Sequence, residues 1–197
     1  MLTIKTRQLK AAIHTAAVKD IRFYLKGVLI ERCTNGDVHI VSTDGACLFA
    51  GLIPAPDADC SQVGPWCMIV PIDAVKTACK TKSPVITLVP MPDGRYTIGD
   101  VVFTPVDGTF PDWRRVAHYP SIEAQPVAPS MLDPELMCKA FDAVRTWHGL
   151  RSDALPAYAQ RDTSCTVVHG PDCTGFAIVM PYRTKIDTAA PFTPASY

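Results

Sequence analysis

Histidines, cysteines and acidic residues are the side chains here that could carry nucleophilic, acid–base or metal chemistry, and the sequence does not cluster them. The five histidines lie in separate predicted elements, at positions 14, 39, 118, 148 and 169. None accompanies a serine nucleophile elbow, an H-E-x-x-H zinc helix or a phosphate-binding loop. Asp44 and Asp112 could be drawn as a carboxylate pair, yet aspartate in a turn usually hydrogen-bonds its own backbone. The sequence therefore predicts that the protein is not an enzyme.

The cysteines show no metal-binding or disulfide pattern. The eight of them contain no C-x-x-C pair, at positions 33, 47, 60, 67, 79, 138, 165 and 173. Cys79 and Cys138 fall inside apolar helical patterns, where a thiol behaves as a small hydrophobe. The N-terminus lacks the long apolar core of a signal peptide. We expect reduced thiols, a cytoplasmic protein, no metal site and no cofactor.

Composition describes a compact globular protein. Hydrophobic residues make up 48% of the 197 residues and charged residues 19%, which argues against disorder. No run of about 18 apolar residues could span a bilayer, so no membrane partner is expected. Lys+Arg and Asp+Glu both number 19. A protein that only coats nucleic acid is usually strongly basic, so any DNA contact must come from a local patch.

The charge is distributed unevenly along the chain. Residues 5–20 carry a net charge of +3 and residues 71–82 a net charge of +2, which leaves −5 for the remainder. Basic helix faces on an acidic body would attract a phosphate backbone without making the whole surface adhesive. Solvated, exposed helix faces are the commoner explanation of such runs. The helix that begins near Asp133 has a net charge of −1 and does not join this pattern.

Apolar periodicity predicts a repeating order of elements. Helices are expected at Arg7–Val18, Ile72–Lys80 and Asp133–Gly149, where apolar residues recur every three or four positions. Short strands follow each of them. The expected strands are Leu2–Thr6, Asp20–Glu31, Val38–Ser42, Leu48–Ile53, Cys67–Pro71, Val85–Val89, Arg95–Ile98, Val101–Thr104, Cys165–His169 and Gly175–Met180. A strand, a helix and several strands recur about every 60 residues, which predicts an α+β fold with antiparallel sheets backed by helices.

One stretch, YTIGDVVFTPVDGTFPDWRRV at residues 96–116, has an unusual composition. Pro105 and the pair at 107–108 end regular strand pairing. Two aromatics, an X-Pro step and an arginine pair follow, and an exit loop that caps the core is the simplest interpretation. The string also resembles the link between the second and third domains of the bacterial DNA polymerase III β subunit, the sliding clamp, whose pattern is VDG-x-FPD-[YW]-RRV.

Three further segments resemble the same family in the same order. They are Asp20–Glu31 with Val41–Gly45, then Met68–Pro71, and Ala177–Arg183, which is similar to the family's C-terminal VVMPMR string. The resemblance implies a DNA-clamp-like fold of repeated βαβββ units. It implies that residues 1–117 form a domain like the middle clamp domain, and residues 118–197 a shorter C-terminal domain or half-domain with a loose tail from Thr184. The chain would be a shortened clamp without the N-terminal domain.

The resemblance also implies an apolar partner-peptide groove. Its walls would be Thr43, Gly45, Leu48, Pro111, Arg115, Val116, Val179, Met180, Pro181, Tyr182 and Arg183. Met and small apolar residues suit an adaptable pocket, and Arg offers donors to peptide carbonyls. Without the resemblance, residues 178–180 would be an ordinary core strand. Where the family has His-Arg after the TDG string, this chain has Ala46-Cys47, so a polar rim is missing.

Backbone contacts to DNA would come from the helices. The expected residues are Arg7, Lys10, His14, Lys76 and Lys80. The implied function is a sliding-clamp-like processivity factor in DNA replication, from a phage or mobile element. It would bind double-stranded DNA without sequence preference and tether a DNA polymerase or other replication and repair partners. A homo-oligomer and a clamp loader are expected partners. The alternative is a clamp-derived interaction module, an adaptor or competitor, that does not encircle DNA.

Overall fold

The structure is a computed structural model, and it describes residues 1–55, 64–117, 132–151, 157–159, 165–172 and 174–181. Its helices are α1 (Thr6–Ile13), η1 (Phe23–Leu25), α2 (Ile72–Ala78), η2 (Trp113–Arg115) and α3 (Pro134–His148), with η1 and η2 of the 3-10 type. Its strands are β1 (Leu2–Lys5), β2 (Gly27–Arg32), β3 (Val38–Thr43), β4 (Cys47–Ile53), β5 (Trp66–Pro71), β6 (Val85–Pro90), β7 (Tyr96–Ile98), β8 (Val101–Phe103), β9 (Ala157–Ala159), β10 (Thr166–His169) and β11 (Gly175–Val179). No helix in these ranges is long and apolar enough to cross a membrane.

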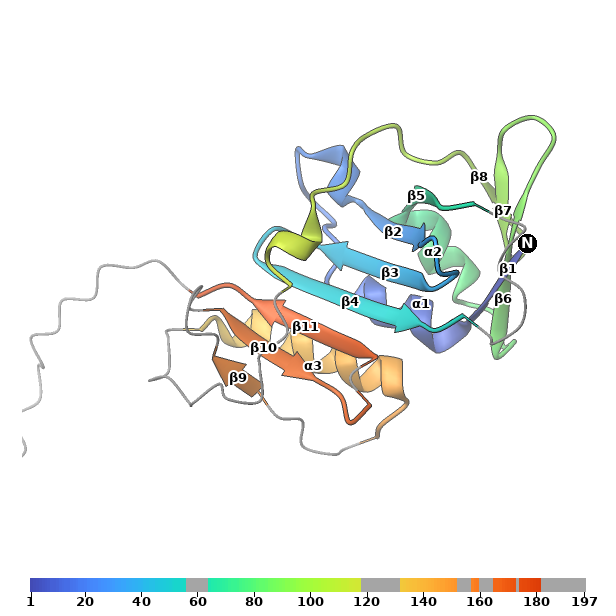
Figure 1. The fold of residues 1–197 in the computed structure, drawn as a ribbon. Coiled ribbons are helices and arrows are strands. Elements are labelled where there is room, and N and C mark those ends of the chain that lie inside the picture. Colours follow the sequence, from blue (N-terminus) through green and yellow to red (C-terminus); the bar gives the residue numbers. More distant parts are fainter. Residues whose placement is uncertain (56–63, 118–131, 152–156, 160–164, 173, 182–197) are drawn as a thin grey trace, which may run out of the picture.

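The strands form two antiparallel sheets (Figure 1). One has seven strands in the order β5-β2-β3-β4-β11-β10-β9, and the other has four in the order β1-β6-β7-β8. The first strand of each of the first two units is exchanged: β1 pairs with β6, and β5 pairs with β2. This exchange ties the first two units into one body. The expected α+β architecture, antiparallel sheets backed by helices, is confirmed.

The seven-stranded sheet has a different core on each face, because successive side chains of a strand point to opposite sides. Helices α1 and α3 lie behind this sheet in Figure 1. The helix-side core includes Leu9, Ala12, Val28, Ile40, Phe49, Val144, Ala177 and Val179. The opposite face carries Leu29, Val41, Leu48, Ala50, Val167 and Ile178, together with Phe110 and Trp113 of the segment after β8. We call this segment, residues 105–117, the link.

A glycine pair and a tryptophan define where β11 joins β4. Gly51 lies directly opposite Gly175 in the β4–β11 ladder. The Trp147 ring of α3 lies over both, and a Cβ at either glycine would approach it to 2.4–2.5 Å. Trp147 is buried, contacts Phe49 with ring centroids 5.6 Å apart, and donates from Nε1 to Thr174 Oγ1 at 3.0 Å. This close packing sets the register between the first unit and the third.

The third helix begins and ends as its sequence predicts. Asp133 is the N-cap and accepts a hydrogen bond from the Glu135 N–H at 2.8 Å, and Pro134 occupies the first helical position. Gly149 ends the helix with φ of 72°, a conformation that favours glycine. The Asn35–Asp37 turn is also as expected, with Gly36 at φ 87°.

Several expected boundaries were wrong. The strand predicted over Asp20–Glu31 begins only at Gly27, because Asp20 accepts from the Arg22 N–H and guanidinium at 2.8–3.0 Å and holds a turn before η1. Helix α1 ends at Ile13 rather than Val18, since the Thr15 hydroxyl bonds Ser42 of β3 at 2.6 Å and draws the chain onto the sheet.

Other expectations are not settled by the described residues. Strand β9 was not predicted, because Ala-Tyr-Ala has no distinctive pattern. The expected loose tail from Thr184 lies outside the described residues. The division at residue 117 stays a prediction, and the seven-stranded sheet runs across it.

Candidate partner groove and nucleic-acid surface

The link crosses the face of the seven-stranded sheet that the helices leave open. Its Val106 N–H donates to the Ile69 carbonyl of β5 at 2.9 Å, and its Phe110 and Trp113 are buried on this face. The Trp113 ring contacts His39, at 5.3 Å between ring centroids, and the Arg114 guanidinium, 4.4 Å from the ring centroid. The aromatics of the FPDWRRV string therefore anchor the link, as the simplest interpretation predicted.

The two link arginines differ in what they contact. Arg114 makes a two-pronged pair with Glu31 of β2 at 2.9 and 3.2 Å. Arg115 is exposed, and its side chain has no hydrogen bond or ion pair to any residue that the structure describes. Of the pair, Arg115 is therefore the one available to a partner.

The Thr43–Gly45 turn is fixed by its own side chains and touches the end of β11. The Thr43 hydroxyl donates to the Cys47 carbonyl at 2.8 Å and accepts from the Gly45 N–H at 3.0 Å. Asp44 accepts from the N–H groups of residues 46 and 47 at 3.0 and 2.8 Å, as an aspartate in a turn is expected to do. The Met180 N–H donates to the Ala46 carbonyl at 2.9 Å. The TDG turn and the C-terminal VMP string, which are distant in the chain, thus meet.

Charge holds the same turn to the third unit. Lys139 of α3 lies 3.4 Å from an Asp44 oxygen and 3.2 Å from Glu135. Cys47, where the family pattern has arginine, points to the helix side, with its Sγ 3.8 Å from the Leu136 carbonyl. Burial, and then the charge of Asp44, raises the pKa of this thiol to about 12. It stays protonated and packs as an apolar group.

The expected groove residues do not all lie on one side. Leu48, Val116 and Met180 belong to the link-side cluster, whereas Val179 belongs to the helix-side core. Ile178, which was not among the predicted groove residues, lies on the link side in place of Val179. Side chains alternate between the two faces along residues 175–180, and this alternation predicts that Ile178 and Val179 face opposite sides. Cys165 also lies there, 3.2 Å from the Met180 sulfur.

The remaining groove residues have mixed exposure. Thr43 is buried, Pro181 is half-buried, and Gly45, Pro111 and Arg115 are exposed. Tyr182 and Arg183 lie outside the described residues. A hollow of about 440 Å³ lies under the link and is lined by Leu29, Ile69, Phe110, Pro111 and Trp113 among others. The groove as a whole stays a prediction.

The expected DNA contacts lie on the helix side, but one of them, His14, packs against α3 instead of facing solvent. Lys10 and Lys80 are exposed and Lys76 is half-buried. Arg7 is exposed, although its Nη1 donates to the His148 carbonyl at the end of α3 at 3.3 Å. His14 instead lies against α3, with Nε2 3.2 Å from Thr146 Oγ1. Burial lowers the pKa of His14, so this residue is suited to packing rather than to a phosphate.

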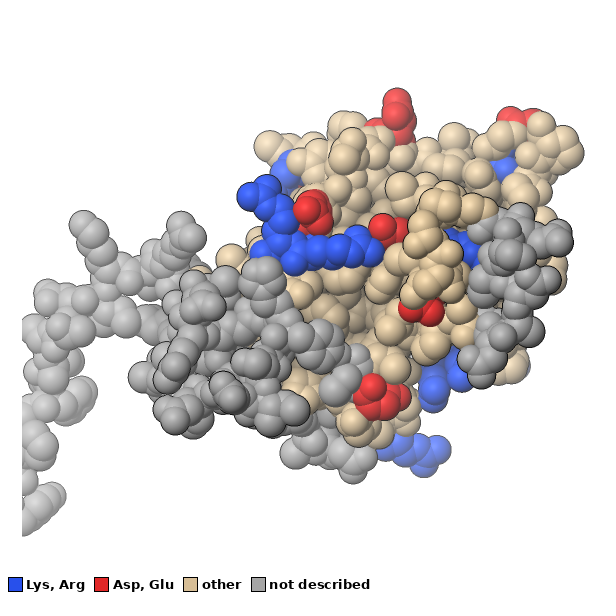
Figure 2. All heavy atoms as spheres, in the orientation of Figure 1, with Lys and Arg blue, Asp and Glu red and all other residues tan. Residues whose placement is uncertain are grey.

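Four cations surround one hollow beside the first turn of α1. It has a volume of about 740 Å³, and its charged lining residues are Lys5, Arg7, Lys10 and Lys82. By contrast, Figure 2 shows basic and acidic residues side by side on the link face, where Arg114 pairs with Glu31. Lys5 and Lys82 were not among the predicted DNA contacts, although each lies in one of the two basic stretches of the sequence.

Known proteins match this chain by structure but not by sequence. No family model matches the sequence, and no curated protein sequence matches it. Solved structures do: the DNA polymerase sliding clamp of Pseudomonas aeruginosa matches with a TM-score of 0.59 and 18% identity over 93% of this chain and 66% of that one. The DNA polymerase III β subunit of Thermotoga maritima matches with a TM-score of 0.65 and 14% identity, over 93% and 65%.

A third match carries a ligand. The Helicobacter pylori β clamp bound to a DNA ligase peptide matches with a TM-score of 0.69 and 11% identity, over 92% of this chain and 66% of that one. The chain therefore has the fold of the bacterial DNA polymerase III β sliding clamps, and it spans about two thirds of the length of these structures. The resemblance read from the sequence is confirmed at the level of the fold.

Proposed function

We propose that this chain is a sliding-clamp-like processivity factor in DNA replication. It binds double-stranded DNA without sequence preference and tethers a polymerase or other replication and repair proteins. The observation that carries the proposal is the meeting of the TDG turn with the end of β11, next to the link-side cluster that holds Leu48, Val116 and Met180. The sheet has the clamp fold, and its other face carries the helices. In this proposal the protein is a non-enzymatic cytoplasmic scaffold.

The DNA surface is the helix side. Lys5, Arg7, Lys10 and Lys82 surround a broad hollow there, and Lys80 is exposed after α2. Lysines at such a surface contact phosphates and carry no sequence information. Because the chain has no net charge, the affinity of one copy is weak and falls steeply with salt. Enclosure of the DNA then supplies the retention that electrostatics does not.

The partner groove lies on the link face. Leu48, Val116, Ile178 and Met180 offer an apolar floor, and the exposed Arg115 offers donors at its edge. Short peptides with apolar anchors fit such a surface. The Helicobacter pylori clamp, which was solved with a DNA ligase peptide, supports this class of partner.

In this proposal a closed ring requires several copies. The described part of one chain holds three helix-containing units, and one chain spans about two thirds of the length of the clamps that it matches. Light scattering behind a sizing column, at several protein concentrations, tests this requirement. A stable closed oligomer is expected, and a clamp loader would open it on DNA. A monomer at every concentration would contradict the ring and leave the adaptor or competitor module. The net charge of −1 over the third helix is the observation that favours that second function.

A further inference from the structure

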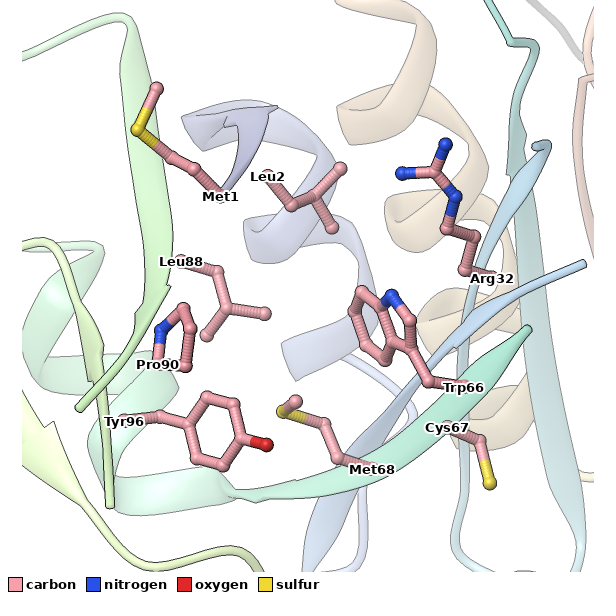
Figure 3. Close-up of a pocket in the computed structure, with 9 residues that line it drawn as sticks. All are labelled: Met1, Leu2, Arg32, Trp66, Cys67, Met68, Leu88, Pro90 and Tyr96. Atoms are coloured by element: carbon pink, nitrogen blue, oxygen red, sulfur yellow. The ribbon is translucent and has the colours of Figure 1, made fainter. Parts of the chain in front are cut away.

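A third and smaller pocket lies where the two sheets meet (Figure 3). It has a volume of about 340 Å³ and opens between β5 of the seven-stranded sheet and β6 and β7 of the four-stranded sheet. Trp66, Met68, Leu88 and Tyr96 give it apolar and aromatic walls. One charged side chain, Arg32 of β2, completes the lining. Arg32, Trp66 and Leu88 line neither of the other two hollows, whereas Met68 and Tyr96 also line the hollow under the link.

Arg32 is a donor without an acceptor. Its Nε is buried with no hydrogen-bond partner, and its guanidinium has no ion pair within the part of the chain that the structure describes. The neighbouring acid, Glu31, is already paired with Arg114 on the opposite face. Leaving a buried donor unpaired is unfavourable, because it loses its hydrogen bond to water and gains none in the protein. A planar guanidinium at the wall of a pocket is suited to a two-pronged bond with a carboxylate.

The edge of β5 adds a second recognition element. Val106 donates to the Ile69 carbonyl at 2.9 Å, so Ile69 directs its backbone away from β2. Backbone direction alternates along an antiparallel strand, so Cys67 also directs its N–H and carbonyl outward. Cys67 is exposed, lines the pocket, and makes no outward backbone hydrogen bond to any described residue. An extended segment could pair with the strand here.

We propose that this pocket binds an extended acidic peptide segment. A large apolar side chain fills the space between Trp66, Met68 and Leu88, and the carboxylate of an adjacent residue pairs with Arg32. The peptide backbone pairs with Cys67 at the edge of β5. The Arg32 guanidinium among apolar walls selects against basic and uncharged segments. The site is centred on Arg32, Trp66 and Leu88 and adjoins the hollow under the link through Met68. It does not rest on the proposed function.

Methionine-methyl NMR of the full chain, read together with an Arg32 variant, tests the proposal. Met68 lines this pocket and the hollow under the link, Met180 lies in the groove, and Arg32 lines this pocket but not the hollow under the link. The probe is the blocked peptide acetyl-Ser-Phe-Asp-Val-Ser-amide. Its titration should move the Met68 methyl signal saturably and leave Met180 unmoved. A twin peptide with asparagine in place of the aspartate should bind roughly tenfold more weakly, since the charge-assisted pair is lost. Arg32→Gln should cause the same loss.

The control is Arg95→Gln, which removes an exposed arginine that pairs with Asp93 outside the pocket; it should bind as the native protein does. Three results would overturn the proposal: an unmoved Met68 signal, a shift confined to Met180, or equal binding of the two peptides. The last uses the unaltered protein, so it holds even if the Arg32 variant folds poorly. Binding of phenylacetate as tightly as the peptide would also overturn it, by assigning the pocket to small carboxylates.

Discussion

Replacing either glycine under Trp147 should destabilise the joint between the first and third units. A Cβ at Gly175 would lie 2.5 Å from Trp147 Cδ1, and one at Gly51 would lie 2.4 Å from Cζ3. Real Cβ atoms essentially never approach so closely. The ring cannot move aside freely, because it is only 3% exposed and its Nε1 is bonded to Thr174. The strain therefore falls on the β4–β11 ladder or on α3.

The expected magnitudes follow from this geometry. Gly175→Ala should lower the free energy of unfolding by about 1–3 kcal/mol, the usual cost of overpacking a core. Trp147→Ala should lower it by about 3–5 kcal/mol through lost burial and a cavity. In the Trp147→Ala background the added methyl group has room, so Gly175→Ala should cost at least about 1 kcal/mol less than in the native protein.

Urea unfolding followed by circular dichroism measures these values, provided the transition is two-state. Gly64→Ala is the matched control, because nothing lies within 4 Å of a Cβ at Gly64; its effect should stay within about 0.5 kcal/mol. The reasoning fails if Gly175→Ala is as stable as the native protein. It fails equally if the effects of the two substitutions add.

Four further predictions concern binding and pH. Lys10→Glu should weaken binding of duplex DNA uniformly across sequences and reduce the slope of log affinity against log salt concentration by about 1. Arg95→Glu should change the affinity and the slope little, and fluorescence anisotropy at several salt concentrations measures both. Met180→Glu should abolish binding of a clamp-binding peptide while peptide binding at the Arg32 pocket persists, as calorimetry can show. Burial lowers the folded-state pKa of His14, so as pH drops through about 6.5 the unfolded chain takes up the proton before the folded one does, and the free energy of unfolding should fall. Urea titrations should show a smaller fall for His14→Gln. A pH profile unchanged by the substitution would refute this prediction. Arg32→Met should leave the melting temperature unchanged or raise it, since it removes a buried unpaired donor; a clear loss would show that Arg32 stabilises the fold.

Much of the fold was predictable, because local signals agree with it. Asp133, Pro134 and Gly149 mark the ends of α3 by chemistry that is complete within one turn. The alternating strands and the recurrence of about 60 residues indicate the antiparallel sheets. The region before β2 was mistaken for strand, since apolar residues at 21–25 satisfy a strand pattern while an Asp20–Arg22 contact decides the conformation.

The sites were less predictable, because they depend on contacts between distant residues. The slot for Trp147 is made by two glycines 124 residues apart, which no local pattern connects. The Arg32 pocket exists only after strands of both sheets come together. The groove was inferred from a resemblance and stays a prediction. The inferred set includes Val179, whose side chain points to the helices.

Topological retention on DNA tests the central claim most directly. The protein is threaded onto linear duplex DNA from its open ends, the ends are then blocked with streptavidin, and the complexes are washed at 0.5 M salt (about ten times the low-salt binding buffer), where phosphate contacts are weak. A sliding clamp should stay on the blocked DNA and leave once a restriction cut reopens an end. Equal loss from blocked and open DNA would contradict the processivity-clamp account.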